Sequence, residues 1–405
     1  MLSRPTLSAA RFILYSHDGC GLGHLRRNLA IAAAVTEEAP DASVVLLTGC
    51  IELGAEGLAP NVEICSLPAL RKLGNGLYGA RRLPISKTEL RVVRARLISA
   101  CVETFRPDVL LIDKHPMGVR GELRPALGSL PEWGGRAVLG LRDILDDPAT
   151  VRQEWSHDGV IEFTEAHCDG VLIYGNPQVF DFVGEYGLPD SLARRARHCG
   201  YVVHPDASRH LALVATPPHR PRVLATAGGG EDGRRLLETF ARAARGAPWD
   251  AAMVAGPQAG PDDLRALRRD AAEGGVEFHE SVSDLPGRLQ DVDALVSMGG
   301  YNTLSEALSL GTPTLCVPRA HPRREQLIRA RAFAKLGLLR LIEPERLSPE
   351  RVGAEVTALL EQDRRAIAGR AHTTLGFDGA QRAAKALLEL AACSVSPRTP
   401  ALQAL

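Results

Sequence analysis

The sequence is short of lysine, of net charge and of aromatic side chains. Five lysines stand against 43 arginines, the 48 basic residues are balanced by 48 acidic ones, and aromatic residues make up 4% of the chain. A chain of zero formal net charge lacks the broad positive surface by which proteins bind nucleic acid, so no nucleic-acid partner is expected. We attribute the excess of arginine and alanine to a GC-rich bacterial genome.

Paired cysteines and long apolar runs are also missing. The eight cysteines are scattered without any CxxC spacing, which indicates small buried side chains in a reducing compartment and neither disulfides nor a zinc site. No apolar run reaches the roughly 18 residues that span a bilayer. The first ten residues have no apolar core of the kind found in signal peptides. We therefore expect a cytoplasmic protein.

Two common nucleotide-binding signatures are absent. No GxxxxGK[ST] occurs, which argues against a P-loop enzyme. The glycines at residues 19–23 follow the pattern GxGxG instead of GxGxxG. The next expected strand, residues 44–48, ends in Thr48-Gly49-Cys50, without the acidic residue that binds a dinucleotide ribose. These features exclude a dehydrogenase of the dinucleotide-binding type.

The apolar segments indicate an α/β protein of two facing Rossmann-like domains with a cleft between them. At 405 residues the chain has room for two domains of ordinary size. Short apolar runs typical of buried parallel strands recur in the first half, at residues 12–16, 44–48, 62–67, 109–113, 137–141 and 171–174. A second series follows at residues 223–226, 251–255, 276–279, 294–297 and 314–317.

Each half opens with a strand, a glycine loop and a helix. The first unit contains the loop 19–23, and the second contains the loop 227–233, whose amides suit a diphosphate. An aperiodic stretch with several prolines, residues 198–222, separates the two series. We therefore place an N-terminal domain at residues 1–205, a linker at 206–221, a C-terminal domain at 222–376, and a final helix and tail at 377–405.

Residues 295–326 are the most informative stretch. An apolar strand ends in Gly299-Gly300, and a helix starts at once. Thr303, with Glu306 three residues later, fits a capping box at the start of this helix. Bare backbone amides after a strand, at the positive end of a helix dipole, suit a phosphate. Glu306 lies one turn into the helix, where it can reach a sugar hydroxyl beside that phosphate.

The order strand, Gly-Gly, helix with an early glutamate, strand and a loop ending in Glu325-Gln326 resembles the donor-binding half of GT-B nucleotide-sugar glycosyltransferases. In particular it resembles the family 28 C-terminal-domain group that includes the peptidoglycan lipid II synthase, a UDP-N-acetylglucosamine transferase. The UDP-glucuronosyltransferases share this layout. The match covers residues 223–341 of the second half, but only residues 19–24 of the first.

The resemblance implies transfer of a sugar from a nucleotide diphosphate sugar, most simply a UDP-sugar, to an acceptor hydroxyl with inversion and without a metal or other cofactor. It also implies that the last helix crosses back to the first domain. Glu306 would bind the ribose, Gln326 with Glu325 the donor sugar, and Val282 the uracil ring. The positions implied at the diphosphate are Gly228, Gly229, Gly230, Gly299 and Gly300. Asn302 and Thr303 are further donor-binding candidates.

His24 is the unusual residue of the first half, because it follows three glycines at the start of a helix. Glycines let a substrate approach the backbone, and an unperturbed histidine, with a pKa near 6.5, suits proton removal. The resembled enzymes place a histidine near the acceptor at this turn, so we assign His24 as the general base. Arg26 and Arg27 are either acceptor contacts or a solvated helix face. The other acceptor-side candidates are Gly21, Gly23, Arg27, His115, Arg142 and Asp143.

Two further segments complete the predictions. Residues 70–85, rich in glycine, arginine and leucine, predict a flap over the acceptor and are the candidate for a peripheral membrane contact. Asp291-Val292-Asp293 has the DxD spacing of metal-dependent glycosyltransferases. It precedes a strand, however, and we interpret it as the turn at the end of a helix.

The residues leave two other functions open. The same donor site with water as acceptor gives a nucleotide-sugar hydrolase or, with rearrangement, an epimerase. A chain that keeps the fold without turnover is a nucleotide-sugar-binding protein. The acceptor, the sugar and the oligomeric state are not specified by the sequence.

Overall fold

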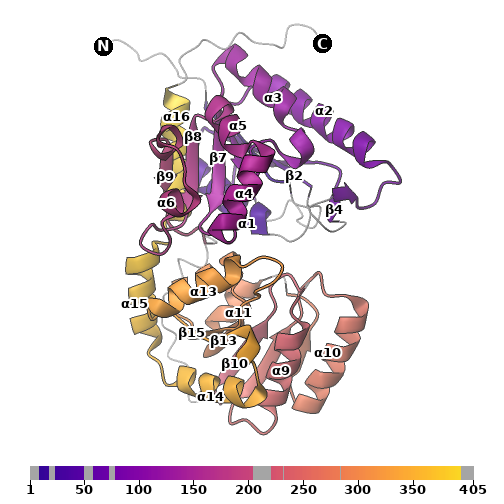
Figure 1. The fold of residues 1–405 in the computed structure, drawn as a ribbon, viewed down its shortest axis with the longest axis vertical. Coiled ribbons are helices and arrows are strands. Elements are labelled where there is room, and N and C mark those ends of the chain that lie inside the picture. The colour runs from indigo at the N-terminus through magenta and orange to yellow at the C-terminus, as the bar shows by residue number, and fades with distance from the viewer. Residues whose placement is uncertain are drawn as a thin grey trace.

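The computed structural model describes residues 9–17, 23–49, 58–72, 78–203, 220–230, 232–282 and 284–393. The described chain forms two α/β domains, one above the other in Figure 1, each built on a parallel sheet. The predicted fold class, two facing Rossmann-like domains, is confirmed.

The first domain contains a sheet of seven strands in the order β3-β2-β1-β6-β7-β8-β9. Its pairs are parallel, with Phe12 of β1 aligned to Val44 of β2 and to Val109 of β6. The strands are β1 (Arg11–Tyr15), β2 (Ser43–Thr48), β3 (Val62–Ser66), β6 (Val109–Asp113), β7 (Arg136–Arg142), β8 (Gly170–Tyr174) and β9 (Ala196–His198). The helices are α1 (Gly23–Glu38), α2 (Lys87–Phe105), α3 (Arg124–Ser129), α4 (Pro148–Asp158), α5 (Val160–His167), α6 (Phe182–Tyr186) and α7 (Asp190–Ala193), with 3-10 turns at Val119–Gly121 and Leu130–Trp133.

This sheet is buried on both faces, which explains why its strands are apolar runs. Phe12 and Leu14 pack with residues of α1, whereas Ile13 and Tyr15 pack on the opposite face with residues of α2 and α3. Successive strand side chains point to opposite faces, so a strand covered on both sides needs apolar residues at every position.

The second domain repeats this arrangement with a six-stranded sheet, in the order β12-β11-β10-β13-β14-β15. The strands are β10 (Arg222–Thr226), β11 (Asp250–Val254), β12 (Glu277–His279), β13 (Ala294–Ser297), β14 (Thr314–Cys316) and β15 (Arg340–Leu341). The helices are α9 (Arg234–Ala244), α10 (Pro261–Gly274), α11 (Leu285–Gln290), α12 (Tyr301–Ser309), α13 (Glu325–Lys335), α14 (Pro349–Leu360) and α15 (Arg364–Leu375), with a 3-10 turn at Pro344–Arg346. Side chains of α9 and α14 contribute to the core on one face, and those of α11 and α12 to the core on the other.

The last helix, α16 (Gly379–Ala392), lies in the first domain, where Figure 1 shows it in yellow among the N-terminal elements. Ala383 and Leu387 are fully buried in the same apolar cluster as Ile31 and Val35 of α1. The chain therefore passes from the first domain to the second and returns, so that the two domains are connected twice.

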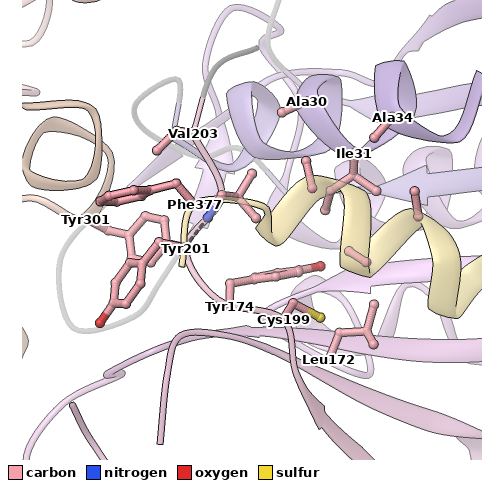
Figure 2. Close-up of a cluster of buried hydrophobic side chains, with 14 of the residues drawn as sticks. Ala30, Ile31, Ala34, Leu172, Tyr174, Cys199, Tyr201, Val203, Tyr301 and Phe377 are labelled. Carbon is pink, nitrogen blue, oxygen red and sulfur yellow. Dashed lines mark hydrogen bonds between the residues drawn. The ribbon is translucent and has the colours of Figure 1, made fainter. Parts of the chain in front are cut away.

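An apolar cluster continues from the core of the first domain to the second domain. Figure 2 shows Tyr174 and Tyr201 of the first domain with Tyr301, the first residue of α12. The rings of Tyr201 and Tyr301 stack with centroids 5.5 Å apart, and Tyr301 Oη accepts a hydrogen bond from the Val202 amide at 3.0 Å. The start of α12 is thus fixed against the other domain.

The fold differs from the sequence prediction in several places. β9, α10, α15 and the first-domain helices from α2 to α7 were not predicted. Part of the predicted flap is a hairpin, in which β4 (Leu70–Lys72) pairs antiparallel with β5 (Tyr78–Ala80), and residues 73–77 lie outside the described residues.

Candidate active site

The functional candidates gather where the strand order of each sheet reverses. In the first domain this point lies between β1 and β6, and in the second between β10 and β13. The loops that leave two such strands turn to opposite faces and leave a crevice beyond the carboxyl ends. His24 and Asp113 lie at the first crevice, and the turns at Gly228 and Gly300 lie at the second.

A cavity of about 240 Å³ lies between the two crevices. It brings together four acceptor-side and six donor-side candidates, namely Gly23, His24, Arg27 and Arg142 with Gly228, Gly229, Val282, Gly300, Asn302 and Thr303. Asn302 Nδ2 also donates to the Gly23 carbonyl across the domains at 3.3 Å. Arg26, which the sequence offered as an acceptor contact or a solvated residue, also lines the cavity. So do Thr226, Leu285 and Tyr301, which the sequence had not singled out for a binding site.

His24 is held by a carboxylate at the end of the neighbouring strand. Its Nδ1 lies 2.9 Å from Oδ2 of Asp113, the last residue of β6. The His24 side chain is 14% exposed, and that of Asp113 is fully buried. Burial lowers the pKa of His24 below its ordinary value, and Asp113 opposes this shift. The pairing was not predicted, because the two residues are 89 positions apart in sequence.

Arg27 stabilises the same carboxylate. Its Nη2 donates to Asp113 Oδ2 at 2.6 Å, and its guanidinium carbon lies over the rings of Tyr174 and Tyr301, 5.1 and 5.6 Å from their centroids. Burial alone would raise the pKa of Asp113, but Arg27 and His24 hold it well below its usual range. A solvated helix face is therefore the wrong interpretation of Arg27, which is 2% exposed.

Two more histidines surround His24. The ring of His17 lies 5.0 Å from that of His24 and 5.2 Å from that of His115. Burial, followed by the neighbouring His24, lowers the pKa of His17 well below its ordinary value. Burial and the adjacent Lys114 lower the pKa of His115 to about 3. His17 and His115 are therefore neutral near pH 7 and add no positive charge beside His24.

The glycine turns of the second domain have conformations that only glycine adopts readily. Gly230 and Gly299 have φ angles of +95° and +89°. A Cβ at Gly230 would lie 2.7 Å from the Ala255 carbonyl oxygen, and one at Gly299 would lie 2.9 Å from Cys316 Sγ. Both turns thus need glycine for backbone strain and for space. Gly230 and Gly299 shape the turns, while Gly228, Gly229 and Gly300 line the cavity.

The predicted capping box at α12 is wrong. The N-cap residue is Gly300, and no side chain caps the helix, because Thr303 already lies in its first turn. The orphan amides at the start of α12 are left for another partner, in the place where Gly300 and Thr303 line the cavity.

Glu306 is instead a buried carboxylate with an incomplete set of hydrogen-bond partners among the described residues. It is 3% exposed, and its Oε2 is buried without a hydrogen-bond partner among the described residues. Burial raises the pKa of Glu306 to about 7, a shift that Arg26 opposes. A buried carboxylate of this kind is costly for folding unless a ligand donates hydrogen bonds to it.

Glu325 and Gln326 both interact with Arg319. Glu325 Oε1 accepts from Arg319 Nη2 at 2.6 Å, while its Oε2 is buried with no partner in the described chain. Gln326 Oε1 accepts from the Arg319 amide at 3.1 Å. Both side chains are held in place but are not among the residues that line the cavity.

The remaining acceptor-side candidates differ in whether they can contact an acceptor in the cavity. Arg142 lines the cavity, and its Nε is buried without a partner in the described part of the chain. Asp143 does not fit an acceptor contact, because its Oδ1 accepts from Arg329 and the Ile144 amide, and its Oδ2 accepts from Arg329 and Tyr201. Gly21 lies outside the described residues.

Asp291 is the C-cap of α11, and Asp293 accepts from the Arg222 amide at 2.7 Å, so the DxD segment serves local structure.

Two features are absent from the residues that the structure describes. Within them, no three or more His, Cys, Asp or Glu side chains are grouped so as to hold a metal ion. None of the helices described is long and apolar enough to cross a membrane.

Known structures and sequences share this architecture. CalG4, the calicheamicin glycosyltransferase, superposes with a TM-score of 0.61 at 16% identity, covering 96% of this chain and 100% of that one. MurG of Acinetobacter baumannii gives a TM-score of 0.57 at 12% identity, with coverage of 94% and 99%. The fold is therefore that of the GT-B glycosyltransferases.

The sequence matches are more specific. The glycosyltransferase family 28 C-terminal domain matches residues 257–387. A UDP-N-acetylglucosamine–N-acetylmuramyl-(pentapeptide) pyrophosphoryl-undecaprenol N-acetylglucosamine transferase of Syntrophotalea carbinolica is 30% identical over 385 residues, 91% of this chain and 95% of the relative. The enzyme of the same name from Methylorubrum extorquens (strain PA1) is 29% identical over 221 residues, and the chain covers 59% of its length. The chain belongs to the glycosyltransferase family 28 group.

Proposed function

We propose that this protein transfers a sugar from a UDP-sugar to an acceptor hydroxyl, with inversion and without a metal. The observation that carries the proposal is the cavity that joins His24, paired with a buried carboxylate, to the glycine turns of the other domain. The relatives named above are UDP-N-acetylglucosamine transferases, which makes this nucleotide sugar the first donor to test.

In this proposal the second domain binds the donor. The uracil lies near Val282, and the ribose hydroxyls donate to Glu306, whose buried carboxylate lacks a complete set of partners among the described residues. The diphosphate accepts hydrogen bonds from the glycine turns and from the uncapped amides of α12. The donor sugar then extends towards His24, near Gln326 and Glu325.

His24 is the general base of the proposed reaction. Asp113 is ionised and accepts from Nδ1–H, which leaves the lone pair of Nε2 free for the acceptor proton. The deprotonating hydroxyl attacks the anomeric carbon while the bond to the diphosphate oxygen breaks. Arg27, Arg142 and the amides stabilise the negative charge that develops on this leaving group.

A peripheral membrane contact is also part of the proposal. Four apolar side chains, here called the α2 patch, are 39–48% exposed on α2 and directly before it: Leu83, Val92, Val93 and Leu97. Exposed basic residues flank them at Arg82, Lys87, Arg91 and Arg96. Apolar side chains among basic ones suit the surface of an anionic bilayer.

The test of the function combines binding with turnover. We expect UDP and UDP-N-acetylglucosamine to raise the melting temperature of the full chain, and GDP- and dTDP-sugars to raise it less. Release of UDP from the sugar nucleotide should require an added acceptor, supplied as a bacterial lipid extract. Equal release of UDP without any acceptor would contradict a transferase and identify a hydrolase, and binding without release in either case would identify a binding protein.

A further inference from the structure

A buried ion pair joins the two domains beside the proposed phosphate site. Asp143 directly follows β7 of the first domain, and Arg329 lies on α13 of the second. Arg329 Nε donates to Asp143 Oδ2 at 2.8 Å, and Nη2 donates to Oδ1 at 2.6 Å. Both side chains are 1% exposed. This two-pronged geometry is the one that a guanidinium and a carboxylate favour when they are withdrawn from water.

Other groups complete the surroundings of the pair. Tyr201 Oη donates to Asp143 Oδ2 at 3.0 Å and the Ile144 amide to Oδ1 at 2.7 Å, so the carboxylate has four donors. The Arg329 guanidinium carbon lies 5.7 Å from the ring centroid of Tyr301. The pair takes no part in the proton transfer assigned to His24 and Asp113, and it does not line the cavity.

The remaining nitrogen of Arg329 reaches the glycine turn. Nη1 donates to the Gly299 carbonyl oxygen at 3.1 Å. That carbonyl and the Gly300 N–H belong to one planar peptide group and point in opposite directions. A contact that fixes the carbonyl therefore also fixes the direction of the Gly300 N–H. Gly300 lines the cavity and is the N-cap of α12.

We propose that Arg329 is a positioning residue for the donor diphosphate, and that Asp143 of the first domain holds it in the working position. This inference rests on the proposed function and adds residues that the resemblance to the family does not assign. Asp143 and Arg329 lie in different domains, so the pair exists only while the domains are in contact. The orientation of the phosphate turn is thereby coupled to contact between the domains.

The coupling follows from the cost of burying a charge. A guanidinium that loses its carboxylate in a dry interface is strongly destabilised and moves towards water. Without Asp143, Arg329 would leave the Gly299 carbonyl, and this flexible turn would lose its preferred orientation. Phosphate binding should then suffer, whereas contacts with the uracil and ribose should not.

The experiment compares UDP with uridine, which lacks the diphosphate, by calorimetry on the full chain. Arg329→Lys and Asp143→Asn should each weaken UDP binding by about 10- to 100-fold, the scale of one lost hydrogen bond to a charged group, and leave uridine binding unchanged. Should either variant fail to fold, Tyr201→Phe removes only one hydrogen bond to Asp143 and should weaken UDP binding by a smaller factor.

Arg324→Gln is the matched control. It removes another ion pair between the domains, Arg324 to Asp147 at 3.4 Å, whose side chains are 49% and 32% exposed and do not reach the glycine turn. It should leave both affinities unchanged. Variants of the buried pair that bind UDP as tightly as the wild type, or that lose UDP and uridine equally, overturn the positioning role alone. A wild-type protein that binds neither ligand overturns the proposed function, and this inference with it.

Discussion

At the scale of single residues, the site combines groups whose protonation is set by their surroundings. His24 is neutral because it is buried, and Asp113 is ionised because Arg27 and His24 adjoin it. Glu306 has a raised pKa because its burial outweighs the attraction of Arg26. In the proposed reaction these three environments suit a proton acceptor, the carboxylate that supports it and a ligand-binding carboxylate.

The role of His24 predicts a separation of turnover from binding. His24→Gln should lower the turnover rate by about 10²–10⁴-fold, the usual scale for a lost general base, and leave UDP affinity nearly unchanged. Steady-state kinetics and calorimetry measure the two effects. Loss of UDP affinity with normal turnover at saturation would make His24 a binding residue.

The same residue predicts the acid limb of the pH–rate profile. Only the neutral imidazole accepts a proton, so the rate falls as the pH drops through the pKa of His24. Because burial lowers that pKa, the midpoint of this fall should lie below pH 6.5, the ordinary histidine value expected from the sequence. Wild-type rates between pH 4.5 and 8 measure the position of this limb. A limb centred above pH 6.5 would contradict the described environment of His24.

Glu306 predicts opposite effects on binding and on stability. The folded protein raises the pKa of Glu306 from 4.5 to about 7, so this group costs stability as the pH rises from its unfolded value through 7. At pH 8, Glu306→Gln should therefore raise the melting temperature of the unliganded protein. The same variant should weaken UDP binding, because a hydrogen bond to a carboxylate is worth about 1.5–3 kcal/mol. Thermal unfolding at pH 5 and pH 8 provides the measurement, and an equal shift at both values would show that ionisation of Glu306 is not the cause.

At the scale of helices and strands, the α2 patch gives the next prediction. The full chain should bind vesicles of phosphatidylglycerol but not of phosphatidylcholine. Salt at 0.5 M should weaken this binding, because the Debye length, about 8 Å at physiological ionic strength, becomes shorter and the charges attract less. Replacing Val92, Val93 and Leu97 together by serine should abolish the binding without changing UDP affinity. Sedimentation with vesicles measures it. Binding by the serine variant as tight as that of the wild type would show that another surface is responsible.

Which elements could be predicted depended on burial. Fully covered strands such as β1 and β6 were recognisable because every residue is apolar. β9 is an edge strand of three residues, two of them charged or titratable, so it carries no apolar run. α15 buries Ile367, Ala368, Ala371 and Leu375 and contains Gly369, and a glycine inside a helix weakens its helical signal. The capping box failed because Gly300 is the N-cap of α12, three residues before the Thr303 N-cap that the Thr303–Glu306 spacing suggested.

At the scale of the whole molecule, the site depends on contacts that no local pattern encodes. Gly228, Gly299 and His24 could be proposed as site residues from the sequence, because glycine turns and a histidine at a helix start are local features. The Asp143–Arg329 pair spans 186 positions of sequence, and an arginine in the middle of a helix is ordinarily a solvated side chain. Only the packing of one domain on the other turns these residues into a buried pair.

The charges around the cavity give the last prediction, which concerns metals. The described residues that line it include Arg26, Arg27 and Arg142 but no carboxylate. Magnesium and manganese prefer oxygen ligands, usually including a carboxylate, whereas a diphosphate between arginines and backbone amides is neutralised without a metal. Activity should therefore persist in excess EDTA. Added Mg²⁺ or Mn²⁺ should change the rate by less than about twofold, an effect no larger than that of one solvent-exposed ion pair. The measurement is the initial rate of sugar transfer after dialysis against chelator. Complete loss of activity, restored by either metal, would assign the leaving diphosphate to a metal ion and would direct attention back to Asp291 and Asp293, the carboxylates of the DxD segment.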